Sequence, residues 1–120
     1  SYALNWPHRM ATPSRRLELH AIGHLTFEAP DTKRFPALRI ARDALREGGA
    51  APIVLNAANE VAVRRFLDGA LGFLEIARVV EDVLDRLNTP APGCIEDVGE
   101  IDKAARRLAM QLVDATPVHK

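Results

Sequence analysis

Hydrophobic positions recur every three or four residues through most of the chain, which is the spacing of an amphipathic helix. Segments at 36–47, 51–68 and 73–87 show this spacing, and a further one begins near Glu96. Glycine or proline residues separate them, as expected where helices end or begin. Because four amphipathic helices with short connections usually pack antiparallel, the pattern predicts a mainly α chain. Its residues 35–120 should form a four-helix, bundle-like domain.

Residues 1–34 lack that period. Apolar and polar residues alternate briefly at 17–19 and 25–28, which predicts one or two short edge strands. A loop this long without its own core is unusual in a compact domain. We therefore expect residues 1–34 to be an extended arm that packs on protein outside this chain. Trp6 and Phe27 are its packing candidates, because large aromatic side chains more often anchor packing than line a ligand pocket.

The segment 52–63 is apolar on nearly every side of a helix, so we expect it to be largely buried. Asn56, Asn59 and Glu60 interrupt it at positions that share one helical face. A buried polar group without a partner costs about 1–3 kcal/mol. One interpretation is that the three side chains cap loops or face water. Another is that they hold this helix against another domain or the arm, and a third gives Glu60 a catalytic role.

Composition narrows the possible partners. Lys plus Arg and Asp plus Glu both number 16, so the formal net charge is zero. A nucleic-acid binder or a polybasic membrane-surface protein needs a basic surplus. No apolar run is long enough to cross a bilayer. The single cysteine, Cys94, cannot form an internal disulfide, which favours a reducing compartment such as the cytoplasm. We expect Cys94 to be an ordinary, half-buried residue.

Two histidines are the remaining candidates for chemistry. His20 and His24 stand four residues apart, a spacing that could place two metal ligands on one helical face. Gly23 lies between them, and the nearby alternation favours a strand or loop. No third ligand is evident, so we predict no metal site here. A glycine-rich phosphate loop after a predicted strand is also absent from the sequence.

Several stretches, in the same order along the chain, resemble the 1-deoxy-D-xylulose 5-phosphate reductoisomerase family. The stretch Leu-Asn-Ala-Ala-Asn-Glu-Val-Ala-Val at 55–63 resembles a signature of that family. Four further stretches agree, at 2–7, 25–31, 34–38 and 72–77. Any one of them would be weak, but together they cover essentially the whole chain.

The resemblance implies a parent enzyme of the non-mevalonate isoprenoid pathway. Such an enzyme converts 1-deoxy-D-xylulose 5-phosphate to 2-C-methyl-D-erythritol 4-phosphate with NADPH and a divalent Mg²⁺ or Mn²⁺, and is typically a homodimer of the bacterial cytoplasm. Its chain runs from a dinucleotide-binding domain through a catalytic domain and a linker to a helical domain. This chain matches the last two parts, so its expected partner is the catalytic domain of the same parent chain.

The resemblance transfers no active-site residue to this chain. The family's metal-binding and phosphate-binding residues lie upstream of Ser1, so we assign no catalytic, cofactor-binding or metal-binding residue and expect the chain alone to be inactive. The alternative is a stand-alone helical protein-interaction module without enzymatic activity. It would explain the bundle and the zero net charge, but not the match of the arm.

Overall fold

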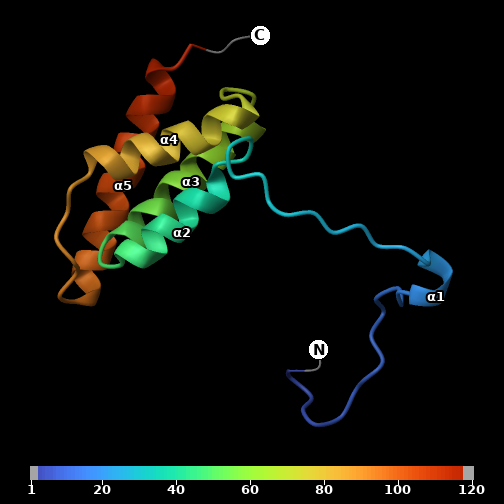
Figure 1. Ribbon diagram of the computed structural model, residues 1–120. Coiled ribbons are helices and arrows are strands. Elements are labelled where there is room, and N and C mark those ends of the chain that lie inside the picture. Colours follow the sequence, from blue (N-terminus) through green and yellow to red (C-terminus); the bar gives the residue numbers. More distant parts are fainter. Residues whose placement is uncertain (1–2, 118–120) are drawn as a thin grey trace.

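The computed structural model describes residues 3–117, so Ser1, Tyr2 and residues 118–120 lie outside the described range. The helices are α1 (Leu19–Ile22), α2 (Ala37–Glu47), α3 (Ala51–Leu67), α4 (Phe73–Arg86) and α5 (Ile95–Ala115). Helices α2 to α5 pack together, while the chain before α2 runs away from them (Figure 1). The four helices that the apolar spacing predicts are therefore present, close to their predicted bounds.

Helix α3 is the centre of the bundle. It packs against α5, α4 and α2, whereas α2 and α5 do not contact each other. Helix α5 thus lies on the side of α3 away from α2 (Figure 1). The side chains that α3 buries are small: Ala51, Val54, Ala57, Ala58, Val61 and Ala62. They allow the neighbouring helices to approach closely. The expectation that this helix is buried on most sides holds only in part, because Asn56, Asn59, Glu60 and Val63 are exposed.

Local sequence sets the helix ends. Helix α2 stops at Gly48, whose φ of 68° and ψ of −152° are open essentially to glycine alone. Helix α5 begins after Cys94, where the carboxylate of Asp97 accepts the backbone N–H of Gly93 at 2.9 Å. Two acidic residues, Glu96 and Asp97, stand in the first turn of α5, where the helix dipole favours negative charge.

The arm differs from the sequence prediction. Within residues 3–117 no strand forms, so the strands expected at 17–19 and 25–28 are absent, and Leu19–Ile22 forms a single helical turn. A strand needs a neighbouring strand to accept and donate its backbone hydrogen bonds, and the described part of the chain offers none. Every residue from 3 to 31 is exposed. The radius of gyration is 19.0 Å, against about 14 Å for a compact chain of this length.

Candidate functional site

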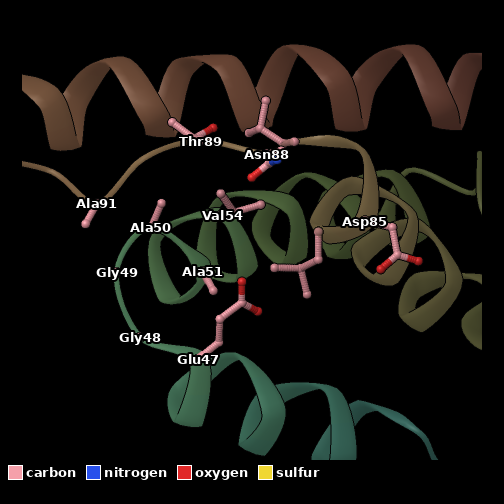
Figure 2. A pocket seen from close by; sticks show the side chains of 12 residues that line it. Glu47, Gly48, Gly49, Ala50, Ala51, Val54, Asp85, Asn88, Thr89 and Ala91 are labelled. Carbon is pink, nitrogen blue, oxygen red and sulfur yellow. The ribbon is translucent and has the colours of Figure 1, made fainter.

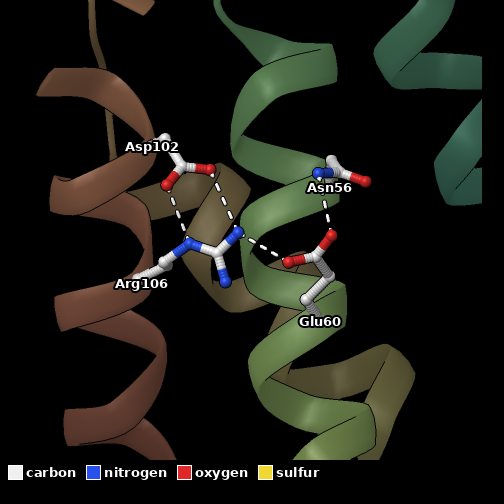
Figure 3. A network of polar contacts seen from close by, with 4 residues as sticks. All are labelled: Asn56, Glu60, Asp102 and Arg106. Atoms are coloured by element: carbon white, nitrogen blue, oxygen red, sulfur yellow. Dashed lines mark hydrogen bonds and ion pairs between the residues drawn. The ribbon is translucent and has the colours of Figure 1, made fainter. Parts of the chain in front are cut away.

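Two of the three polar residues that interrupt the apolar segment 52–63 of α3 belong to a network with α5. The guanidinium of Arg106 donates to Asp102 on its own helix, with Nε–Oδ2 at 2.7 Å and Nη2–Oδ1 at 3.3 Å. The same Nη2 donates to Oε2 of Glu60 at 2.6 Å. Asn56 donates from Nδ2 to Oε1 of Glu60 at 3.4 Å (Figure 3). One arginine thereby connects α5 to α3.

The charges of this network support one another. The hydrogen bond from Arg106 to Asp102, and to a smaller extent the one to Glu60, raise the pKa of Arg106 above its ordinary value, so the guanidinium stays protonated. Because one Glu60 oxygen accepts from Arg106 and the other from Asn56, its carboxylate is engaged within the chain. The Glu60 side chain is 54% exposed. This arrangement holds two helices together, and it does not present Glu60 as a general base.

Asn59, the third polar residue of the segment 52–63, takes no part in this network. It lines an apolar groove that runs over α3 between α2 and α4, which we name the α2–α4 groove. The groove consists of two adjoining hollows of about 290 Å³ and 310 Å³ that share four lining residues: Ala37, Asn59, Ile76 and Ala77. The amide of Asn59 is exposed and makes no hydrogen bond to any residue of the described chain. Asn56 lines the same groove but donates to Glu60, so Asn59 is the one of the three whose side chain makes no hydrogen bond within the described chain.

The arm's two packing candidates expose most of their surface. Trp6 is 71% exposed and Phe27 is 87% exposed. The structure therefore brings Asn56 and Glu60 together and places both Asn56 and Asn59 along the groove. The arm, which carries Trp6 and Phe27, runs away from the bundle (Figure 1). Cys94 is exposed rather than half-buried. It stands just before the first turn of α5 and does not occupy a core-facing position of the helix.

Sequence reasoning missed the rim of the groove. Phe73 begins the apolar stripe of α4, yet it is 61% exposed, and its ring meets that of Phe66 edge-on with the ring centres 5.8 Å apart. Leu74 beside it is 69% exposed. Both stand in the first turn of α4, where a helix projects beyond its neighbours. That position in the sequence is the signal that could have identified them.

A hollow of about 470 Å³ lies beside the turn that joins α2 to α3 (Figure 2). Glu47 and Asp85 place carboxylates on its wall, which would repel a phosphate. The start of α3 does not compensate, because the N–H groups of Ala51, Ile53 and Val54 already donate to backbone carbonyls, and the remaining first-turn residue is a proline. The lining does not fit the phosphates of a dinucleotide.

A divalent metal does not fit this chain's residues either. Among residues 3–117 no group of three or more His, Cys, Asp or Glu side chains is close enough to hold a metal ion. His20 and His24 are both exposed, and His20 lies in the single turn of α1. Over the same residues, no helix is both long enough and apolar enough to span a membrane.

Comparisons with known proteins cover nearly the whole chain. Residues 1–108 match the family model described as the DXP reductoisomerase C-terminal domain. The chain is 47% identical over 116 residues to 1-deoxy-D-xylulose 5-phosphate reductoisomerase of Zymomonas mobilis, covering 97% of this chain and 30% of that protein. It is 55% identical over 113 residues to the protein of that name from Rhodospirillum centenum, covering 94% of this chain and 28% of the relative.

Solved structures agree with the sequence matches. The chain matches 1-deoxy-D-xylulose 5-phosphate reductoisomerase from Zymomonas mobilis in complex with NADPH with a TM-score of 0.84 and 46% identity, over 96% of this chain and 30% of that one. A DOX-P reductoisomerase in complex with NADPH, fosmidomycin and magnesium gives a TM-score of 0.85 and 34% identity, over 94% and 30%. The chain spans about 30% of the length of these relatives.

Proposed function

This chain belongs to the DXP reductoisomerase C-terminal domain family, and from that premise we propose that it is the carboxy-terminal structural part of a reductoisomerase. The parent enzyme converts 1-deoxy-D-xylulose 5-phosphate to 2-C-methyl-D-erythritol 4-phosphate, with NADPH as reductant and Mg²⁺ or Mn²⁺ as the metal. The observation that carries this proposal is the match over 97% of the chain, arm included, to a relative of that name.

The role of this chain in the reaction is indirect. The hollow beside the α2–α3 turn does not suit a dinucleotide, and the described residues provide no metal-ligand cluster. The chain instead provides a rigid four-helix body and an arm that packs on the catalytic domain of the same polypeptide. The exposed rings of Trp6 and Phe27 support this assignment of residues 1–34. Burial of a large aromatic ring removes much apolar surface from water and so contributes a large favourable free energy to packing.

The homodimer belongs to the same proposal. The family resemblance supports it, and it concerns the parent enzyme rather than any contact within this chain. The stand-alone interaction module is not favoured, because the curated relatives match the arm as well as the bundle. A self-sufficient module would have no need of an arm whose apolar side chains face water.

The test compares the chain alone with its full-length parent. Purified residues 1–120 mixed with 1-deoxy-D-xylulose 5-phosphate, Mg²⁺ and NADPH should give no loss of NADPH absorbance above the buffer rate. The full-length parent should oxidise NADPH, and the same parent truncated after residue 34 of this numbering should lose that activity. NADPH oxidation by the chain alone, or full activity of a truncated parent, would contradict the proposal. Circular dichroism of each protein checks that it is folded.

A further inference from the structure

The α2–α4 groove ends where the arm joins the bundle. Its open end is lined by Phe35, Val63, Phe73 and Leu74, and the adjoining hollow continues along Ile40 and Val80. Phe35 is 51% exposed, Phe73 61% and Leu74 69%. A contiguous apolar surface of this kind, with polar residues at its edge, usually marks an interaction site rather than a surface meant to stay in water.

Besides Asn56, whose amide already donates to Glu60, two polar groups line the groove and give it a chemical preference. The amide of Asn59, midway along it, can both donate and accept a hydrogen bond. At the open end the guanidinium of Arg34 stands 5.5 Å from the centre of the Phe35 ring and forms no ion pair with any residue between 3 and 117. The groove therefore suits an apolar segment that carries a polar backbone or side-chain group and ends near a carboxylate.

The position of the groove identifies the source of that segment. Its open end includes Arg34, the last residue of the arm, and Phe35 and Pro36, which lead directly into α2. The match leaves more than two thirds of each relative uncovered, and the family model describes this chain as the C-terminal domain. A domain attached through the arm is held beside the groove at high effective concentration, an advantage that a second copy or an unrelated protein lacks.

We propose that the α2–α4 groove is the seat of an apolar segment, with a carboxylate near its end, from the catalytic domain that precedes this chain in the same polypeptide. The proposal rests on the proposed function and adds to it the surface through which the helical body is docked. The arm and the groove then form one continuous interface, from Trp6 through Phe27 to Leu74.

The experiment measures thiol labelling in the full-length parent enzyme. The native Cys94 is replaced by Ser, and single cysteines are introduced by Leu74→Cys in the groove, Phe27→Cys in the arm and Lys103→Cys on α5. Lys103 is the matched control, since its side chain is 69% exposed and Leu74 is 69% exposed. Ala77→Cys serves as a second groove probe that changes the surface less. Maleimide incorporation at each site is followed by mass spectrometry of peptides.

We expect the thiols at positions 74 and 77 to react at least about tenfold more slowly than the thiol at position 103, with position 27 protected as well. Protection at 27 with fast labelling at 74 and 77 would overturn the groove assignment and leave the proposed function intact. Fast labelling at all three would contradict the domain packing of the proposed function itself. Protection at 74 that disappears when the enzyme is diluted to monomers, as sized by light scattering, would assign the groove to a second copy.

Discussion

At the scale of single residues, Arg106 carries the polar connection between α3 and α5. Its guanidinium satisfies Asp102 on its own helix and Glu60 on the neighbouring one. The Arg106 side chain is 34% exposed and that of Glu60 is 54% exposed. Water and salt therefore screen the pair, which places its contribution to the free energy of unfolding within about 0–1 kcal/mol.

A double-mutant cycle tests the interaction between Glu60 and Arg106. Glu60→Ala and Arg106→Ala, alone and combined, should give a coupling energy of about 0.5–1 kcal/mol in urea unfolding, falling as salt is added. The pair Glu100–Lys103 is the control, because its atoms are 3.4 Å apart on exposed side chains of one helix, and its coupling should be about 0.3 kcal/mol or less. A coupling for Glu60–Arg106 no larger than the control would show that the contact is incidental.

The start of α5 gives a pH-dependent prediction. The backbone N–H of Gly93, followed by contacts from Cys94, lowers the pKa of Asp97 below its ordinary value. A lowered folded-state pKa stabilises the fold above the unfolded-state value, and that stability is lost as the pH falls through the folded-state pKa. Asp97→Asn should therefore lower the Tm at pH 7 and have progressively less effect as the medium is acidified below the ordinary aspartate range. An equal loss of Tm at neutral and acidic pH would exclude an ionised cap.

At the scale of elements, the turn between α2 and α3 determines how closely these helices can pack. Gly48 and Gly49 both have positive φ, 68° and 58°, which lets the chain reverse within a few residues. Helix α3 then begins at Ala51 with a proline in its first turn. The short turn sets α2 against α3, and the face of α2 that remains forms one wall of the α2–α4 groove.

Two glycine substitutions distinguish the effect of backbone strain from that of a steric clash. No atom lies within 4 Å of a Cβ added at Gly48 or at Gly99, so neither alanine would clash. Gly48→Ala should lower the free energy of unfolding by about 1–3 kcal/mol, because the conformation at that position is nearly closed to other residues. Gly99→Ala, inside α5, should raise it by about 0.5–1 kcal/mol. Urea unfolding distinguishes the two, and equal effects would contradict the backbone argument.

At the scale of the whole molecule, the chain has a small core and much uncovered apolar surface. Its largest fully buried side chains are valines, Val54 and Val83, and most other core positions of α3 and α5 are alanine. Large side chains such as Leu4, Leu17 and Phe27 are instead exposed on the arm. The bundle therefore gains little from burial for its length, and the parent enzyme should stabilise it.

Substituting an arm residue tests this distribution of stability. Phe27→Ala should change the Tm of the 120-residue chain very little, since the ring is 87% exposed there. In the full-length parent the same substitution should cost about 3–5 kcal/mol, the usual range for a buried phenylalanine. Arg16→Ala, in the same arm, is the control and should be near neutral in both proteins. Scanning calorimetry of the four variants gives the comparison, and a neutral Phe27→Ala in the parent would remove Phe27 from the packing interface.

The helices were predictable because each carries its own signal. The stripe that includes Ile76, Val80 and Leu84 specifies α4, and the glycines at 48 and 49 specify where α2 ends. The hydrogen-bond network of Glu60 was harder to predict from the sequence. The spacing of Asp102 and Arg106 indicates a contact within one helix, but nothing local indicates that Arg106 also reaches Glu60, 46 residues earlier in the chain.

The sequence by itself determined the four helices of the bundle, their approximate limits and the family to which the chain belongs, because these depend on short-range spacing and on residues that stand side by side. Tertiary structure alone decided that Glu60 is paired while Asn59 is not, that Phe73 and Leu74 project from the bundle, and that the arm forms no strand within the described residues. Those outcomes depend on which surfaces meet. A strand needs a neighbour to pair its backbone hydrogen bonds, and an exposed ring needs a neighbour to bury it, and neither is specified by the local sequence.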